Sequence, residues 1–363
     1  MEPPRKLHVG VVGLGRMGKR HALNFFHNVP RAILTAVCSI DDVEREWATH
    51  TLAPSGVAVY ENYDDMLRHP GMDAVCISTT TSVHAPQTIA AIAAGKHVLC
   101  EKPLATSTDV SQTVVDAATR RPDLKVMCGF SRRFDASYRD AYAKVRSGII
   151  GKACVMRCQT GDVLDPTGFF VNYAAQSGGI FVDCAIHDVD LALWFFEGAK
   201  VRSVSAIGIT AIEPDLLQYN DRDNVMGMIE FEDGRIASVY TSRMMIAGQE
   251  DSTEIIGTEG KLTINMIPVA NHVQIYKPGG IHHELPQNYW ERFHQAFTTE
   301  AVEFTDCCLD DTQVPVELAS AVAAVEIASA LQEAMITGNK VVFDDKGRRI
   351  SSSSGQAQRR TKL

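Results

Sequence analysis

Residues 7–18, LHVGVVGLGRMG, decide the fold of the first part of this chain. Their first half is a β-branched run that predicts a buried strand, and three glycines follow it in the spacing G-x-G-x-x-G. Residues 17–28 then have helical character. A strand, a glycine loop and a helix in this order are typical of dinucleotide binding, because the loop brings backbone close to a pyrophosphate at the helix N-terminus; the alternative is a glycine-rich turn without a ligand. The residues expected to bind the cofactor here are Gly13, Gly15, Arg16, Met17 and Gly18.

The choice between NAD and NADP depends on the end of a second predicted strand, residues 32–38. An acid that binds the adenosine ribose of NAD is expected there, but Ser39 stands in its place. A serine leaves room for the 2′-phosphate of NADP. Ile40 supplies no cation for that phosphate, however, and Asp41 and Asp42 would repel it. These observations conflict; they favour NAD and leave both cofactors open, with Ser39 as a cofactor-binding candidate.

Strands and helices go on alternating as far as about residue 130. Strands are predicted at 73–78, 97–100 and 125–128, with helices at 83–94 and 108–119 between them. Such βα units predict a parallel sheet whose ligands bind beyond the carboxyl ends of the strands. The side chains expected at that edge are Thr79, Thr80, His84, Glu101, Lys102, Arg132 and Arg133.

The pattern changes after a predicted linking helix at 134–147. A helix is expected at 177–196, and further helices at 289–307 and 316–337. Consecutive strands with hairpin turns predict a mostly antiparallel sheet. These strands are expected at 152–160, 200–212, 223–231, 235–243, 252–257, 261–266, 272–277 and 340–343.

The expected fold is therefore α/β, with an N-terminal Rossmann dinucleotide-binding domain and a C-terminal α+β domain built on a large, mostly antiparallel open sheet. We place the first domain at 1–130 and the second, the expected substrate-binding domain, at 131–345. Two domains also suit a length of 363 residues. Residues 346–363 hold six Lys or Arg and no acid, and are expected to form a basic, disordered tail.

Composition and charge exclude several classes of function. The chain carries a net charge of −9, which argues against a general nucleic-acid or anionic-membrane binder. Its nine cysteines show no CxxC pair and several lie in apolar runs, as buried free thiols do. Neither a signal peptide nor an apolar run of membrane-spanning length is evident. We expect a soluble cytoplasmic protein, although the final Thr361-Lys362-Leu363 resembles a peroxisomal address.

Three residues carry the expected chemistry. On a helix, Asp183 and His187 would share one face, and the carboxylate would tune the imidazole as a proton acceptor near neutral pH. Oxidation of an alcohol needs such an acceptor, because the hydroxyl proton leaves together with the hydride. Lys102, beyond a buried strand and beside Pro103, can stabilise the developing alkoxide. The alternatives are a structural Asp–His pair and a solvated loop lysine. No third ligand stands at a convincing spacing, so no metal site is expected.

Four segments together resemble the glucose–fructose oxidoreductase/inositol dehydrogenase (Gfo/Idh/MocA) family, and inositol 2-dehydrogenase-like members most. They are GVVGLGRMGKRHA (10–22), TTTSVHAPQTIAAIAAGKHVLCEKPLA (79–105), GFSRRFD (129–135) and SGGIFVDCAIHDVDLALWFF (177–196). The resemblance covers about residues 5–345. It implies an N-terminal Rossmann domain and a C-terminal domain whose open sheet mediates dimers or tetramers.

The resemblance also implies roles for matching positions. Lys102 would be the lysine of the EKP motif, Asp183 the active-site aspartate, His187 the general acid/base, and His84 the histidine at the nicotinamide end. Arg133 and Tyr173 are further candidates for substrate contact. The implied activity is hydride transfer between NAD(P) and a secondary alcohol or ketone of a cyclic polyol or sugar. A non-catalytic NAD(P)-binding sensor and an NAD-dependent glycosidase on the same scaffold are the alternatives.

Overall fold

The computed structural model describes residues 5–350, and the chain divides into two compact units. The first consists of Met1–Asp135 and His294–Val325, and the second of Ala136–Phe293 and Glu326–Leu363. The sequence predicted one boundary at residue 130. The structure instead assigns a late segment to the first unit as well, so the chain passes between the units more than once.

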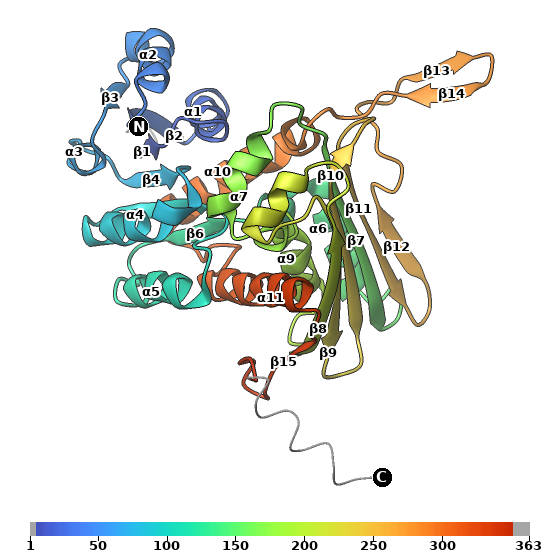
Figure 1. The fold of residues 1–363 in the computed structure, drawn as a ribbon. Coiled ribbons are helices and arrows are strands. Elements are labelled where there is room, and N and C mark those ends of the chain that lie inside the picture. Colours follow the sequence, from blue (N-terminus) through green and yellow to red (C-terminus); the bar gives the residue numbers. More distant parts are fainter. Residues whose placement is uncertain (1–4, 351–363) are drawn as a thin grey trace. The chain divides into compact units, whose positions relative to one another are not determined.

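A six-stranded sheet forms the centre of the first unit (Figure 1). All of its strand pairs are parallel, which confirms the predicted parallel sheet. The order β3-β2-β1-β4-β5-β6 reverses direction between β1 and β4, and open α/β sheets bind ligands at such a switch point. The strands are β1 (Leu7–Val12), β2 (Ala32–Cys38), β3 (Ala58–Tyr60), β4 (Ala74–Ile77), β5 (His97–Glu101) and β6 (Val126–Gly129).

Helices connect these strands, and side-chain caps begin several of them. Asp41 accepts the Glu44 amide at the start of α2, Asn62 caps α3, and Ser107 caps α5. The helices are α1 (Gly18–His27), α2 (Asp42–Thr51), α3 (Tyr63–Leu67), α4 (Thr81–Ala93) and α5 (Thr108–Thr119), with short 3₁₀ turns η1 (Ala53–Ser55) and η2 (Ser131–Phe134).

Helix α10 (Tyr289–Asp310) joins the first unit through contacts with α1 and the loop after it. The Asn24 side chain donates to the Phe297 carbonyl over 3.0 Å, and the Phe297 ring meets His21 edge-on. The Arg31 guanidinium lies 2.7 Å from a carboxylate oxygen of Asp306. These contacts span more than 250 residues of sequence, and so no local pattern could predict them.

The second unit contains a seven-stranded sheet in the order β12-β11-β7-β10-β9-β8-β15. Every pair is antiparallel except β7 with β10, which confirms the predicted, mostly antiparallel sheet. Its strands are β7 (Ala153–Val163), β8 (Val201–Ile209), β9 (Asn224–Phe231), β10 (Ile236–Met245), β11 (Glu250–Gly257), β12 (Lys261–Ile264) and β15 (Val341–Val342). A separate hairpin, β13 (Gln274–Lys277) with β14 (Gly280–His283), stands away from this sheet (Figure 1).

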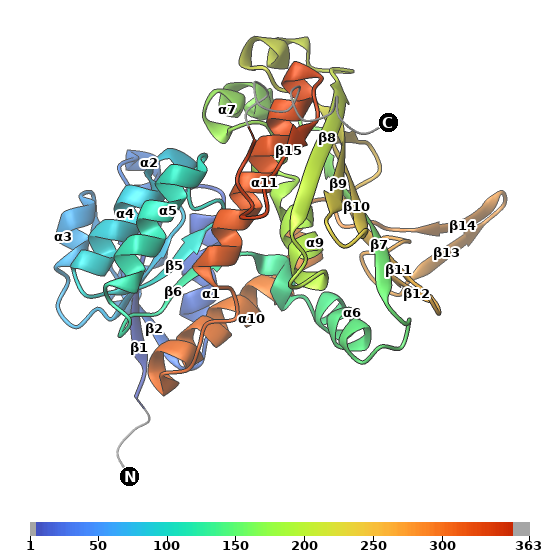
Figure 2. The same cartoon turned by 90° about the horizontal axis from the view of Figure 1, so that it is seen from below.

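Helices cover one face of the second sheet. They include α6 (Ala136–Arg146), α7 (Phe169–Ser177), α8 (Ile180–Asp183), α9 (Ile186–Phe195) and α11 (Leu318–Thr337), and a 3₁₀ turn, η3 (Pro214–Tyr219), precedes β9. A side chain at Gly227 on β9 would collide with Leu331 and Phe181, so helices α11 and α8 pack closely there. Figure 2 shows α9 and α11 along the same strands.

Two details differ from the expectations, and a third prediction lies outside the described residues. The helix predicted at 177–196 is interrupted at Cys184 and Ala185, between α8 and α9. Residues 346–350 were assigned to the basic tail, yet they turn back onto the second unit, where Arg349 ion-pairs with Glu326 and Glu333. The remaining tail, including Thr361-Lys362-Leu363, lies outside the described residues.

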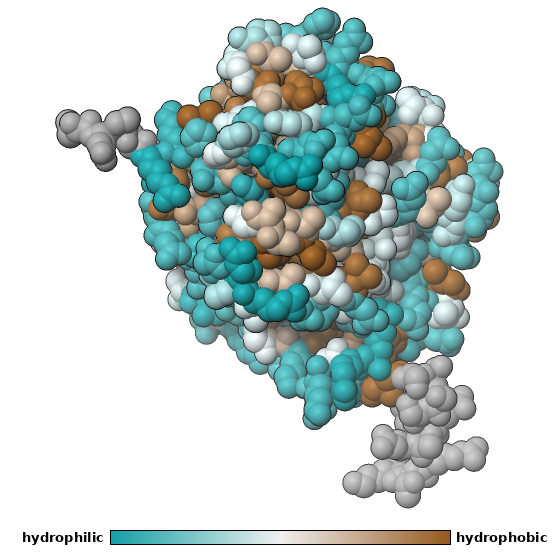
Figure 3. All heavy atoms as spheres, turned by 90° about the vertical axis from the view of Figure 1, so that its left-hand side faces the viewer, coloured by the Kyte–Doolittle hydropathy of each residue, from teal (hydrophilic) through white to brown (hydrophobic). Residues whose placement is uncertain are grey.

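One helix and the surface of the protein can be compared with the expectation that no segment spans a membrane. Helix α11 is long and apolar enough to cross a membrane by length and composition. However, 56% of that stretch is buried within the protein, as in a core helix of a globular protein. The face drawn in Figure 3 is mostly hydrophilic, with hydrophobic residues in small groups among polar ones.

Candidate active site

The glycine loop after β1 has the geometry that a dinucleotide requires. Gly13 has a φ of +80°, and a Cβ there would lie 2.6 Å from the Ser78 carbonyl oxygen. A Cβ at Gly18 would overlap the Gly13 carbonyl, so α1 packs directly against the turn. A Cβ at Gly15 would meet only Glu44, at 3.4 Å, which leaves its other side open to a ligand. The loop residues thus fit a pyrophosphate at the N-terminus of α1.

Glu44 supplies the acid that the sequence lacked at the end of β2. Its Oε2 accepts the Ser39 hydroxyl over 2.5 Å and the Leu14 amide over 3.2 Å. This places a carboxylate between the glycine loop and the strand end, where the adenosine ribose of NAD is bound in this fold. Glu44 was not singled out from the sequence because it lies in the first turn of α2, five positions after Ser39, and not at the end of the strand.

His84 lies between the two loops that follow β4 and β5. Its ring is buried, with Nε2 3.0 Å from the Thr79 carbonyl and Nδ1 2.8 Å from the Pro103 carbonyl. Burial lowers the pKa of His84, so the ring is neutral and donates to one carbonyl at a time. The Thr79 hydroxyl donates to Gln87, and Thr80 begins α4. The His84 ring therefore contacts the backbone of both loops and helps to hold them together.

The EKP segment stands at the carboxyl end of β5, beside the switch point. Glu101 is buried, and its Oε2 accepts the Lys102 amide over 3.1 Å. The Lys102 side chain is half-buried. Arg133 follows β6, the neighbouring strand, and is buried in the 3₁₀ turn η2. The first unit thus gathers the predicted cofactor loops, Lys102 and Arg133 at one edge of one sheet.

The second unit holds the other candidates, around the break between α8 and α9. Asp183 ends α8, and its Oδ2 accepts from Nη2 of Arg243 on β10 over 2.8 Å. Nη1 of the same guanidinium lies 3.2 Å from Asp221, whose side chain is fully buried. His187 lies in the first turn of α9. Cys184 and Ala185, at the break, keep right-handed helical backbone angles, so the shared face of Asp183 and His187 stays a prediction. Arg243 adds a contact from β10 that holds the Asp183 carboxylate.

Cys184 adds a thiol to this polar region. Its Sγ donates to Asp162 over 3.0 Å, and Gln249 donates to the other oxygen of that carboxylate. Burial, reinforced by the nearby carboxylates, raises the pKa of Cys184 well above its ordinary value. The group is therefore a neutral thiol and not an activated nucleophile.

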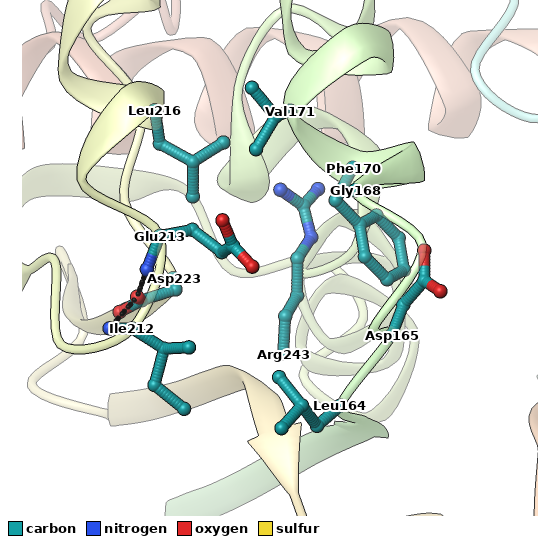
Figure 4. Close-up of a pocket in the computed structure, with 10 residues that line it drawn as sticks. All are labelled: Leu164, Asp165, Gly168, Phe170, Val171, Ile212, Glu213, Leu216, Asp223 and Arg243. Atoms are coloured by element: carbon teal, nitrogen blue, oxygen red, sulfur yellow. Dashed lines mark hydrogen bonds between the residues drawn. The ribbon is translucent and has the colours of Figure 1, made fainter.

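A small hollow lies beside Arg243 in the second unit (Figure 4). Its enclosed volume is about 10 Å³, which is room for about one water molecule. Glu213 and the Arg243 guanidinium point toward one another across it, and Phe170 lies under the guanidinium, 4.7 Å from its ring centre. Tyr173 lies on the same helix as Phe170 and stacks on Phe169. The lining residues are Leu164, Asp165, Gly168, Phe170, Val171, Ile212, Glu213, Leu216, Asp223 and Arg243.

The charged side chains at this hollow are largely paired within the protein. The Arg243 guanidinium is already engaged by Asp183 and Asp221. Asp223 is already occupied, since it accepts the backbone amides of 211–213. Sequence reasoning singled out none of these lining residues, because they come from the segment after β7, from α7, from the segment between β8 and β9, and from β10. Among residues 5–350, no three His, Cys, Asp or Glu side chains are grouped to hold a metal ion.

Two family models match the chain. Residues 7–130 match the NAD-binding Rossmann fold of the GFO/IDH/MocA oxidoreductase family, and residues 138–263 match the C-terminal domain of that family. The scyllo-inositol 2-dehydrogenase (NAD(+)) of Bacillus subtilis is 34% identical over 94% of this chain and 97% of that protein. The myo-inositol 2-dehydrogenase of Thermotoga maritima is 30% identical over 82% of this chain and 87% of that protein.

A solved structure gives the same relationship. The scyllo-inositol dehydrogenase of Lactobacillus casei, crystallised with NAD(H) and scyllo-inositol, has a TM-score of 0.88 and 35% identity, covering 93% of this chain and 99% of that one. The chain therefore belongs to the GFO/IDH/MocA family of oxidoreductases, and its first unit is an NAD-binding Rossmann domain.

Proposed function

We propose that the protein is an NAD-dependent dehydrogenase that oxidises a secondary alcohol of a cyclic polyol of the inositol class, or reduces the matching ketone. The observation that carries the proposal is that the similarity to scyllo-inositol dehydrogenases extends over both units of the chain. The chain therefore matches both the cofactor-binding and the substrate-binding parts of those proteins. Lys102, Asp183 and His187 are also all present.

The proposed reaction uses one proton acceptor and one oxyanion stabiliser. Bound NAD⁺ supplies the hydride acceptor. His187 takes the hydroxyl proton, and Lys102 donates a hydrogen bond to the substrate oxygen as negative charge develops on it. Arg243 pairs with one oxygen of Asp183 and holds the carboxylate in place, so that Asp183 accepts a hydrogen bond from the substrate or from His187 and orients it. In this proposal His187 is the proton acceptor, Lys102 stabilises the oxyanion, and Asp183 orients the substrate or His187.

The carboxylate of Glu44 supports NAD as the preferred cofactor. A 2′-phosphate beside it would bring two negative groups together near the Ser39 hydroxyl, and the side chain of Ile40 offers no cation. The serine at position 39 left room for a 2′-phosphate, but the neighbouring Glu44 carboxylate disfavours it.

The same fold suggests how copies of the chain associate. The face of the second sheet opposite its helices exposes Ile207, Met226 and Met228, of which the first two are directly paired between β8 and β9. An exposed apolar sheet face marks an interaction surface. We propose a homo-dimer or homo-tetramer joined through this face. The nine cysteines are free thiols, which supports a reducing, cytoplasmic location.

The test of the activity is a substrate panel with both cofactors. Scyllo-inositol, myo-inositol, D-chiro-inositol and glucose are each offered with NAD⁺ and with NADP⁺, and the absorbance of the reduced nicotinamide is followed. We expect oxidation of at least one inositol with NAD⁺. Tight NAD⁺ binding without oxidation of any polyol would contradict the proposal and favour a non-catalytic sensor.

A further inference from the structure

A buried polar cluster lies beneath the EKP lysine, entirely within the first unit. His21 on α1 is 1% exposed, and its Nε2 lies 2.7 Å from Oε1 of Glu101. The other oxygen of Glu101 accepts the amide of Lys102. One carboxylate therefore connects a buried imidazole to the backbone of the lysine that is proposed to contact the substrate.

Glu300 on α10 brings a second carboxyl group into this cluster. Its side chain is fully buried, and neither of its oxygens has a hydrogen-bond partner among residues 5–350. A Cβ built at Gly129, on the neighbouring strand, would lie 3.6 Å from Oε1 of Glu300. Burial of an unpaired carboxylate is costly, and the group avoids that cost by keeping its proton. Burial, aided by the charge of Glu101, raises the pKa of Glu300 to about 8.

The charges of the cluster balance when Glu300 is neutral. Burial alone would lower the pKa of His21, but Cys76 and Glu101 outweigh burial and raise it well above its ordinary value. Burial would raise the pKa of Glu101, but the hydrogen bond and charge of His21, with Lys102, lower it. The pair is therefore an imidazolium and a carboxylate. Two further titratable groups near Glu101 are neutral, because burial lowers the pKa of His84 and raises the pKa of Cys100.

A second buried charge would upset this balance. If Glu300 ionised, the cluster, whose Glu101 accepts the amide of Lys102, would carry one net negative charge. A nearby negative charge favours the protonated form of a lysine. While Glu300 is neutral, the charges of Glu101 and His21 cancel each other. When Glu300 ionises at alkaline pH, the added negative charge favours the protonated form of Lys102.

We propose that His21 and Glu300 are positioning residues for Lys102, acting through Glu101, with Glu300 present as a neutral carboxylic acid in the working enzyme. This inference rests on the proposed dehydrogenase function, in which Lys102 donates to the reacting oxygen. No contact of either residue with substrate or cofactor is implied, since both are buried under the strand end.

The first test compares pH profiles of the Glu300→Gln variant and the full-length wild type, using whichever inositol the wild type oxidises. Glutamine replaces a neutral acid with a neutral amide of the same shape. We expect NAD⁺ binding and kcat at pH 7 within about twofold of wild type, but an alkaline limb of kcat/KM shifted to lower pH by at least about half a unit. Glu303→Gln, half-exposed on the same helix, is the control and should leave the profile unchanged. Superimposable profiles of Glu300→Gln and wild type would overturn the proposal.

The second test examines His21. We expect His21→Gln to lower kcat at least tenfold while KM for NAD⁺ changes by less than about threefold, because the glycine loop is untouched. Unchanged kcat would remove His21 from the positioning role, and an equal loss of NAD⁺ binding would indicate a merely structural one.

A third measurement needs neither activity nor a folded variant. Infrared difference spectra of the wild-type protein across pH 6 to 10 should show a carboxylic-acid C=O band near neutral pH that disappears at alkaline pH, and that is missing from Glu300→Gln if this variant folds. Absence of the band in wild type at pH 7 would refute a neutral Glu300. Because this readout does not depend on substrate, it separates failure of the cluster from failure of the proposed function.

Discussion

The Arg243 guanidinium on β10 lies 2.8 Å from the Asp183 carboxylate at the end of α8, and the arginine side chain is 2% exposed. A second buried carboxylate, Asp221, lies 3.2 Å from the same guanidinium. This arrangement ties Asp183, the proposed active-site aspartate, to β10 in the second sheet. It also means that the charge of Asp183 is compensated from behind, by a residue more than 50 positions away in sequence.

Replacement of Arg243 should therefore damage stability and turnover together. We expect Arg243→Met to leave two carboxylates without their cation and to lower the free energy of unfolding by about 3–5 kcal/mol. Urea denaturation measures this loss. The control is Arg157→Met, whose side chain is 66% exposed and pairs with Glu254; it should cost no more than about 1 kcal/mol. Equal, small losses for both variants would show that Arg243 does not hold Asp183.

Replacement of Lys102 or His187 should remove catalysis and spare cofactor binding. We expect Lys102→Ala and His187→Ala to reduce kcat by about 10²–10⁴-fold, the range for loss of an acid–base or oxyanion-stabilising group. The Kd for NADH, from fluorescence titration, should stay close to wild type because the glycine loop and Glu44 are intact. Full activity in either purified variant would exclude that residue from the mechanism.

Glu44 should control the choice of cofactor. We expect Glu44→Gln to lower the ratio of kcat/KM for NAD⁺ over NADP⁺ by at least about tenfold, because the charge that repels a 2′-phosphate is gone. Steady-state kinetics with both cofactors measure the ratio. Glu46→Gln, exposed on the same helix, is the matched control. A ratio that stays unchanged in Glu44→Gln would return the cofactor choice to Ser39 and the two aspartates after it.

Glu300 should make the stability of the protein depend on pH. The ordinary pKa of its carboxyl is 4.5, and burial raises it to about 8 in the folded protein. The folded state therefore binds this proton more tightly, and the stability present below pH 4.5 is lost progressively as the pH rises to about 8. We expect Glu300→Gln to match wild type near pH 5 and to exceed it by a few kcal/mol at pH 9. Urea denaturation at pH 5, 7 and 9 tests this; a constant difference across the range would contradict it.

The open face of the second sheet should determine the oligomeric state. We expect Met226→Lys, which places a charge on the exposed part of β9, to reduce the molar mass measured by light scattering after gel filtration. Met266→Lys, equally exposed but outside the sheet strands, is the control. If Met226→Lys leaves the mass of the wild-type assembly unchanged, another surface joins the copies.

Local sequence patterns were sufficient for most of the fold. The βα alternation up to residue 130 predicted the parallel sheet, because buried strands appear as short apolar runs and glycines mark the cofactor loop. The consecutive strands after residue 150 likewise predicted the mostly antiparallel sheet. The break between α8 and α9 was not predictable, since Cys184 and Ala185 are compatible with a continuous helix. The placement of α10 in the first unit was missed because its contacts with α1 and the loop after it span more than 250 residues of sequence.

What the sequence alone determined is the set of reactive side chains and the elements that carry them: the glycine loop, Lys102 after β5, and Asp183 and His187 near the start of the helical segment. Only the tertiary structure decided which groups surround them. Glu44, Arg243 and Glu300 each act on a site residue across a turn or a large sequence separation, and electrostatic contacts of this kind leave no periodic pattern in the chain. Hydrophobic periodicity reports local burial, whereas the pairing of buried charges depends on the folded arrangement as a whole.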